Sequence, residues 1–173
     1  MIKLIYSSII IFLSLFNTVH AELNIAFIDM NKIIETSQPG ASLIKQLNEL
    51  NQINLKNFEN EEKIIKENEE TIIKQKNIIS EKEFKANIEK LKLEINNYKK
   101  NRNKVINDFN QLKINNTNNL LKSINPILAK FSNEKSISII LQKKNLVIGK
   151  TELDITDEII MIINENIKEF KIQ

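Results

Sequence analysis

Apolar side chains recur at alternating steps of four and three residues in the second half of a long stretch without helix breakers. The 85 residues between Gly40 and Pro126 contain no glycine or proline, and they are rich in residues that favour helices. The repeat comprises Phe84, Ile88, Leu91, Ile95, Tyr98, Arg102, Val105, Phe109 and Leu112. This spacing is typical of the seam of a coiled coil, and only Arg102 interrupts its apolar character.

The first half of the stretch is less regular. Its seam begins with Leu43, Leu47 and Leu50 and continues, in a changed phase, with Phe58, Ile65, Ile72 and Ile79. Polar residues occupy most of the seam positions between the last four. We therefore expect this half to pack less tightly than the second.

A helix start signal lies in the middle of the stretch. Ser80 and Glu83 have the spacing of a capping box, and Ile79 and Phe84 have that of a hydrophobic staple. One helix is thus predicted to end near residue 77 and a second to begin at Ser80. The sequence predicts an antiparallel hairpin over residues 41–125 with its tip near 77–80. A straight helix of about 130 Å, with a serine in its middle, is the alternative.

Charge favours the hairpin. Residues 59–70 hold six glutamates against two lysines, and a tip near residue 80 places them opposite the lysines of residues 90–101. An acidic block facing a basic block favours one register. A solvated charged face is the alternative interpretation.

The two ends of the chain have a different pattern. Residues 23–30 predict a buried strand, followed by a helical turn and a break at Pro39-Gly40. Residues 136–142 alternate apolar and polar side chains and, with residues 146–150, predict a β-hairpin. Thr156 is the expected N-cap of a last helix.

These pieces, residues 22–40 and 126–173, predict a small β-rich head, so that the fold class is α+β. A core of this size is marginal by itself, and its strands would have open edges. We therefore expect an obligate oligomer.

The first 21 residues have the features of a secretory signal peptide. Lys3 precedes an apolar run of about thirteen residues, and small residues precede a cleavage site between Ala21 and Glu22. The run is shorter than the roughly 20 residues of a spanning helix, although a retained anchor is the alternative. The sequence thus predicts export.

Composition disfavours an enzyme. The chain has no cysteine, and its one histidine, His20, lies in the predicted signal peptide. The exported chain would have no thiol nucleophile, no imidazole base and no Cys or His metal ligand. Neither glycine stands in a phosphate-binding motif. We expect no catalytic residue, cofactor or metal.

Three segments carry a resemblance to a known family. The N-terminal IAFIDMNKIIETSQPG, the charged hairpin and the closing LVIGKTELDITDEIIMIIN resemble the Skp/OmpH periplasmic chaperones, with Asp154-Ile155-Thr156-Asp157 as the most specific piece. The resemblance implies a homotrimer whose heads form a shared body, with three hairpins around a cavity. It implies an ATP-independent holdase that keeps unfolded outer-membrane β-barrel proteins soluble in the periplasm for outer-membrane assembly.

Two sets of arm residues are candidate contacts for partners. Candidate client contacts are Phe58, Ile64, Ile65, Ile72, Ile73, Ile78, Phe84 and Ile88, which pack across the hairpin in the alternative interpretation. Candidate contacts for anionic lipid or lipopolysaccharide are Lys99, Lys100, Arg102 and Lys104, which otherwise form a solvated face.

A second function remains open at this point. A periplasmic coiled-coil adaptor with one defined partner would share the export signal, the oligomer and the hairpin. A nucleic-acid partner is not expected for an exported chain.

Overall fold

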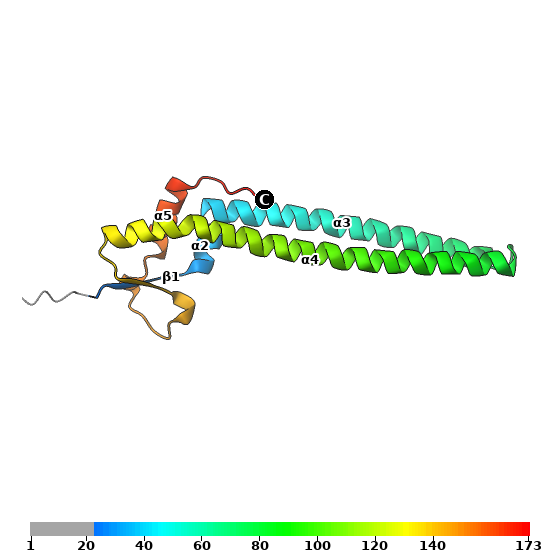
Figure 1. Ribbon diagram of the computed structural model, residues 1–173, viewed down its shortest axis with the longest axis horizontal. Coiled ribbons are helices and arrows are strands. Elements are labelled where there is room, and N and C mark those ends of the chain that lie inside the picture. Colours follow the sequence, from blue (N-terminus) through cyan, green and yellow to red (C-terminus); the bar gives the residue numbers. More distant parts are fainter. Residues whose placement is uncertain (1–22) are drawn as a thin grey trace, which may run out of the picture.

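The computed structural model describes residues 23–173, so the predicted signal peptide and its cleavage site between Ala21 and Glu22 lie outside the described residues. Figure 1 shows a small head at one end, from which α3 and α4 extend side by side as one long arm. This arrangement confirms the predicted α+β fold class. The elements, in chain order, are β1 (Ile25–Ile28), α2 (Met30–Thr36), α3 (Gln38–Gln75), α4 (Glu81–Glu134), β2 (Ile139–Gln142), the 3-10 turns η1 (Lys143–Asn145) and η2 (Thr151–Leu153), and α5 (Thr156–Asn166).

The sheet of the head has two strands, and they are parallel. β1 pairs with β2 in a register that places Ile25 opposite Ile139 and Ile28 opposite Gln142. The β-hairpin predicted from residues 136–142 and 146–150 is therefore wrong. Alternating side chains indicate that a segment is a strand, but they do not specify which strand lies beside it.

Residues 146–150 form no strand in the described chain. The preceding residues Lys143–Asn145 form a 3-10 turn that leads the chain away from β2 instead of reversing it alongside. Val147 is then fully exposed, at 103% of its reference area, and Ile148 is exposed at 90%. Two large aliphatic side chains thus face outward from the head.

The arm is an antiparallel hairpin of two long helices, and the straight-helix alternative is wrong. α3 has 38 residues and α4 has 54. α3 ends at Gln75, two residues before the predicted position. The predicted capping box is present, since Ser80 Oγ accepts from the Glu83 backbone N–H (3.3 Å) and the Ser80 N–H donates to Glu83 Oε2 (3.1 Å). The tip thus closes without a glycine.

The break predicted at Pro39-Gly40 falls earlier in the chain. Ser37 is both the C-cap of α2 and the N-cap of α3, and its hydroxyl accepts from the Gly40 N–H (3.3 Å). Pro39 lies in the first turn of α3, where its missing N–H needs no partner. The proline therefore starts the helix instead of interrupting it.

α4 continues through Pro126, where the sequence predicted the change from arm to head. An internal proline costs about 3 kcal/mol because it removes a backbone hydrogen bond and crowds the preceding turn. Leu120, Ile124 and Phe131 lie on one face of α4 and are almost completely buried. Burial of each such side chain stabilises by about 1.5–3 kcal/mol, which outweighs the cost of the proline.

The seam of the arm follows the predicted repeat. Phe58 and Leu91 are buried, and Ile65, Ile72 and Ile95 are half-buried between the helices. The register matches the one expected for a tip near residue 80. The ion pairs expected to fix it do not form, since the salt bridges on the arm between residues 23 and 173 all lie within one helix.

Head and arm share one hydrophobic core. The core comprises Ile28, Ile33, Leu43, Leu47, Leu120, Ile124, Phe131, Ile159 and Ile163, which come from β1 and from each of the helices α2 to α5. The base of the arm is therefore anchored in the head, while the distal arm is held by the seam alone.

Gly40 provides the first stability prediction. A Cβ atom at this position would lie 1.9 Å from the backbone oxygen of Ile34, so α2 and α3 can approach only because residue 40 is glycine. We expect Gly40→Ala to lower the free energy of unfolding by about 1–3 kcal/mol in urea denaturation. A helical Gly→Ala change without such a contact stabilises by up to about 1 kcal/mol, so a gain in stability would contradict the packing described.

Candidate functional site

The arm exposes aliphatic side chains along its whole length. The exposed large apolar residues of the arm are Ile53, Leu55, Ile64, Ile73, Ile78, Leu93, Ile106 and Ile114. They lie outside the seam, on both helices and, for Ile78, at the tip. An open surface with separate apolar patches can contact chains of many shapes, because apolar contact is not directional.

The middle of the arm is hollowed between its two helices. A groove of about 600 Å³ lies there, and its apolar lining comes from Ile64, Ile65, Leu93 and Tyr98. Leu93 is 64% exposed, so the groove is open to solvent, while Ile65 and Tyr98 of its lining belong to the seam. Glutamate, lysine and asparagine side chains form the rest of the lining.

The structure separates the eight candidate client contacts into two groups. Ile64, Ile73 and Ile78 are exposed, the last at 80%. The other five are buried or half-buried in the seam, and they are Phe58, Ile65, Ile72, Phe84 and Ile88.

Sequence reasoning missed five exposed arm residues, namely Ile53, Leu55, Leu93, Ile106 and Ile114. The signal that could have found them is their position off the four-three repeat. An aliphatic residue outside the seam of a two-helix arm has no partner helix to cover it.

The four candidate anionic-partner residues lie on α4. Lys99, Lys100, Arg102 and Lys104 are exposed, and none of them forms an ion pair with another residue of the range 23–173. Arg102 also contacts α3, since its guanidinium carbon lies 5.6 Å from the centre of the Phe58 ring. The one charged position of the seam is thus accommodated by stacking on an aromatic side chain.

A polar contact beside Arg102 joins the two helices. The Tyr98 hydroxyl donates a hydrogen bond to Glu62 Oε1 on α3, and nearer the tip Asn68 Nδ2 donates to the Glu94 carboxylate (3.1 Å). Burial of the phenol, followed by the hydrogen bond to Glu62, raises the pKa of Tyr98 to about 12. These contacts specify the register that the ion pairs were expected to fix.

The head also exposes apolar side chains. They are Leu23, Ile25, Ile139, Leu141, Val147, Ile148, Leu153 and Met161. On its other edge, β1 contacts Asp154 through the bridge at Phe27. Within the described chain no strand pairs with the outer edge of β2. An open strand edge beside exposed aliphatic residues is a surface suited to another polypeptide chain.

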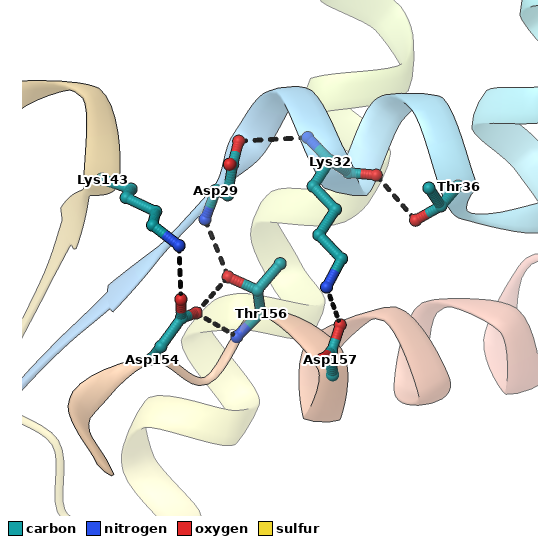
Figure 2. A network of polar contacts seen from close by, with 7 residues as sticks. All are labelled: Asp29, Lys32, Thr36, Lys143, Asp154, Thr156 and Asp157. Atoms are coloured by element: carbon teal, nitrogen blue, oxygen red, sulfur yellow. Dashed lines mark hydrogen bonds and ion pairs between the residues drawn. The ribbon is translucent and has the colours of Figure 1, made fainter. Parts of the chain in front are cut away.

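A polar network joins the pieces of the head (Figure 2). The Thr156 hydroxyl accepts from the Asp29 backbone N–H (2.8 Å) and donates to Asp154 Oδ1. Asp154 also accepts from the Thr156 N–H (3.1 Å) and from Lys143 Nζ (2.9 Å). Lys32 of α2 pairs with Asp157 of α5 (2.5 Å). The network therefore ties β1, α2 and the turn after β2 to the start of α5.

The sequence predicted Thr156 as the N-cap of the last helix, and this prediction is wrong. Thr156 is the first residue of α5, and Asp154 accepts its backbone N–H. Burial by itself would raise the pKa of Asp154, but the hydrogen bonds from Thr156 and Lys143 together hold this pKa below its ordinary value. Asp154 is therefore ionised at neutral pH and accepts the hydrogen bonds that join the turn after β2 to the start of α5.

No group of three or more His, Cys, Asp or Glu side chains among residues 23–173 has the arrangement of a metal site. None of the helices in this range combines the length and the apolar character needed to cross a membrane.

A small mixed head carrying a long antiparallel helical hairpin defines an α+β coiled-coil fold. The chain belongs to the OmpH-like outer membrane protein family, whose sequence model matches residues 24–163. A candidate outer membrane chaperone (OmpH-like) from Caulobacter crescentus CB15 has a similar solved structure, with a TM-score of 0.80 and 12% sequence identity. The match covers 86% of this chain and 88% of the other, and at this identity it shows a shared fold. No curated protein matches the chain significantly in sequence.

Tyr98 gives a spectroscopic test of the arm register. It is the only tyrosine in residues 22–173, and the chain has no tryptophan. We expect ultraviolet absorbance to show phenol ionisation near pH 12 instead of its ordinary value of 10.0. The stability contributed by neutral Tyr98 should be present below pH 10 and lost as the pH rises from 10 to 12.

The matched variants are Glu62→Ala and Glu59→Ala. The first should lower the ionisation midpoint, because the hydrogen-bond acceptor and its charge are gone. The second removes an exposed carboxylate that does not contact Tyr98 and should leave the midpoint unchanged. A midpoint near pH 10 in the unmodified chain would contradict the contact between Tyr98 and Glu62.

Asp154 gives a test of the head network. Because its pKa is lowered in the folded state, its contribution to stability should be complete above pH 3.8 and lost as the pH falls through the folded value. We expect Asp154→Asn to lower the free energy of unfolding at pH 7 by about 1–3 kcal/mol and to remove this part of the acid dependence. Urea denaturation between pH 2 and 7 measures both effects.

Asp157→Asn is the control for this experiment. Its ion pair with Lys32 is largely exposed, so its loss should cost no more than about 1 kcal/mol. Equal losses of unfolding free energy for the two variants would contradict the structural role of Asp154 in the network.

Proposed function

We propose that this protein is a non-enzymatic, ATP-independent holdase. It binds unfolded outer-membrane β-barrel proteins in the periplasm and keeps them soluble for assembly into the outer membrane. Membership of the OmpH-like family supports the connection with outer-membrane proteins, and the export signal predicted over residues 1–21 supports the compartment.

The exposed aliphatic side chains of the arm carry this proposal. They include Ile64 and Leu93 at the mid-arm groove and Ile73 and Ile78 towards the tip. Strands of outer-membrane barrels have apolar side chains at alternate positions, and these would aggregate if left in water. Each contact with a separate aliphatic side chain is weak. Together such contacts retain a client without requiring it to adopt one shape.

The head supports the proposal of a homotrimer. Val147 and Ile148 are exposed on the head, and within the described chain no strand pairs with the outer edge of β2. Burial of these residues between heads would enlarge a small core and place several arms around one space. Clients would then contact more than one arm at once, and this raises the overall affinity without any stronger single contact.

The basic residues of α4 suggest an additional partner. Lys99, Lys100, Arg102 and Lys104 place four exposed cations within six positions of the chain. We assign them a weak contact with the anionic groups of lipid or lipopolysaccharide. The contact would be electrostatic and would weaken with increasing salt.

Sedimentation with a porin diluted from urea tests the holdase proposal. The chain of residues 22–173, without nucleotide, should form a discrete soluble complex with the unfolded porin and none with the folded porin. A variant with Ile64→Ser, Ile73→Ser and Leu93→Ser should bind at least about tenfold more weakly, because three apolar contacts are lost. Its circular dichroism should be unchanged, because these side chains are exposed.

A matched variant carries Asn60→Ser, Glu70→Ser and Asn96→Ser, which alter exposed polar positions of the same helices. It should retain the porin as the unmodified chain does. If the unmodified protein leaves the porin to aggregate, the holdase proposal fails. The adaptor with one defined partner then becomes the better interpretation.

A further inference from the structure

The end of the chain forms a strap across the base of the arm. We use this name for residues 167–173, of sequence IKEFKIQ, which follow α5 and return alongside α3 in Figure 1. The family match ends at residue 163, so the strap lies beyond the matched part of the chain. The proposed holdase function of the arm does not involve it.

Gln46 of α3 binds the backbone of the strap at two points. Its Nε2 donates to the Phe170 carbonyl (2.5 Å), and its Oε1 accepts from the Ile172 N–H (3.2 Å). The Ser42 hydroxyl donates to the same Phe170 carbonyl (3.0 Å). One side-chain amide therefore binds an acceptor and a donor two residues apart, as the backbone of an adjacent strand would.

Asn116 of α4 also binds the strap through both polar atoms of its amide, here to a single residue. Its Oδ1 accepts from the Gln173 N–H (2.9 Å), and its Nδ2 donates to the Gln173 oxygen (3.2 Å). Asn116 is 1% exposed, and its remaining contact is a hydrogen bond to the Leu112 carbonyl (2.9 Å). A buried amide is destabilised when its partners are lost, so the bound strap stabilises this position.

The side chains of the strap alternate as in a β-strand. Phe170 and Ile172 are half-buried against the core, and Lys171 between them is exposed. In the part of the chain that the structure describes, residues 168–173 form no backbone–backbone hydrogen bond and no ion pair. The strap is thus held by hydrogen bonds from a few side chains and by three half-buried apolar residues, Ile167, Phe170 and Ile172, and such segments open locally at low free-energy cost.

We propose that the strap occupies a binding site for an extended polypeptide segment with apolar side chains at alternate positions. Such a segment of a client exchanges with the strap. The hydrogen bonds from Gln46, Ser42 and Asn116 all go to backbone atoms, so they place no demand on the sequence of the occupant. The identification of that occupant as an outer-membrane strand rests on the proposed function, because those strands alternate in this way.

Exchange gives the strap a regulatory effect on binding. A tethered occupant competes at a high effective concentration. The apparent affinity for a client segment is therefore the intrinsic affinity multiplied by the fraction of sites that the strap has left open. Weakly apolar segments do not displace the strap. When a client leaves, the strap returns and restores the partners of Asn116.

A synthetic peptide tests the site on the full chain of residues 22–173. The probe is a fluorescently labelled peptide with the sequence of residues 166–173. Its affinity is compared between the unmodified chain and the variant Phe170→Ser/Ile172→Ser, in which the strap has lost its apolar contacts. We expect the variant to bind the probe at least tenfold more tightly in anisotropy titrations, and Lys171→Ser to leave the affinity unchanged.

Two further experiments test whether the site recognises the peptide backbone. Adding Gln46→Ala to the released variant should abolish binding of the probe, whereas adding Asn48→Ala, an exposed position of the same helix, should not. A probe methylated on the backbone nitrogens equivalent to Ile172 and Gln173 should not bind. Equal binding of the methylated and unmethylated probes would overturn the proposal.

Hydrogen exchange on the unmodified chain provides a measurement that does not depend on any variant. The Ile172 and Gln173 amides should be protected in the free protein and should lose protection in excess probe. If both amides stay protected at saturating probe, the strap is a fixed part of the fold and the proposal is wrong. The same conclusion follows if the strap is released only when the protein associates with itself.

The porin experiment separates this proposal from the holdase function. If the porin is retained while the released variant does not bind the probe, the peptide site is wrong and the holdase function stands. If the probe binds and the porin still aggregates, the site stands and its assignment to outer-membrane strands fails.

Discussion

The parallel pairing of β1 with β2 is the constraint on which the rest of the structure depends. Parallel neighbours require a crossover connection, and here that crossover is the whole arm together with α2. Because the chain must leave and re-enter the same small sheet, α3 and α4 begin and end at one base. The bond between Thr156 and Asp29 then adds α5 to that base, and the shared core fixes all of these elements together.

The parts of the fold that depend on neighbouring residues could be predicted from the sequence. The capping box needs only Ser80 and Glu83, and the seam needs only a regular spacing of apolar residues. The partner of β2 could not be found in this way, because residues far apart in the chain determine it. The continuation of α4 through Pro126 could not be predicted from the sequence either, since it depends on burial of Ile124 and Phe131 in a core to which other elements contribute.

The candidate surface was predictable to a similar extent. Isoleucine pairs stand at 64–65, 72–73 and 78–79, and the seven-residue spacing of Ile65, Ile72 and Ile79 predicted the seam member of each pair. In the structure Ile65, Ile72 and Ile79 lie at seam positions seven residues apart, and their neighbours point outward. The contacts of Asn116 with residue 173 leave no sequence pattern at all, because a side chain that binds backbone atoms places no requirement on the bound residues.

The closure of the tip by a capping box has a consequence for how such arms diversify. Among residues 23–173 the arm contacts the head only near its base, and its turn needs no specialised loop. Inserting seven residues into each helix at facing positions preserves the phase of the seam and extends the arm by about 10 Å. Arm length is thus a modular property, which evolution can adjust in steps of a heptad while the head keeps its sequence.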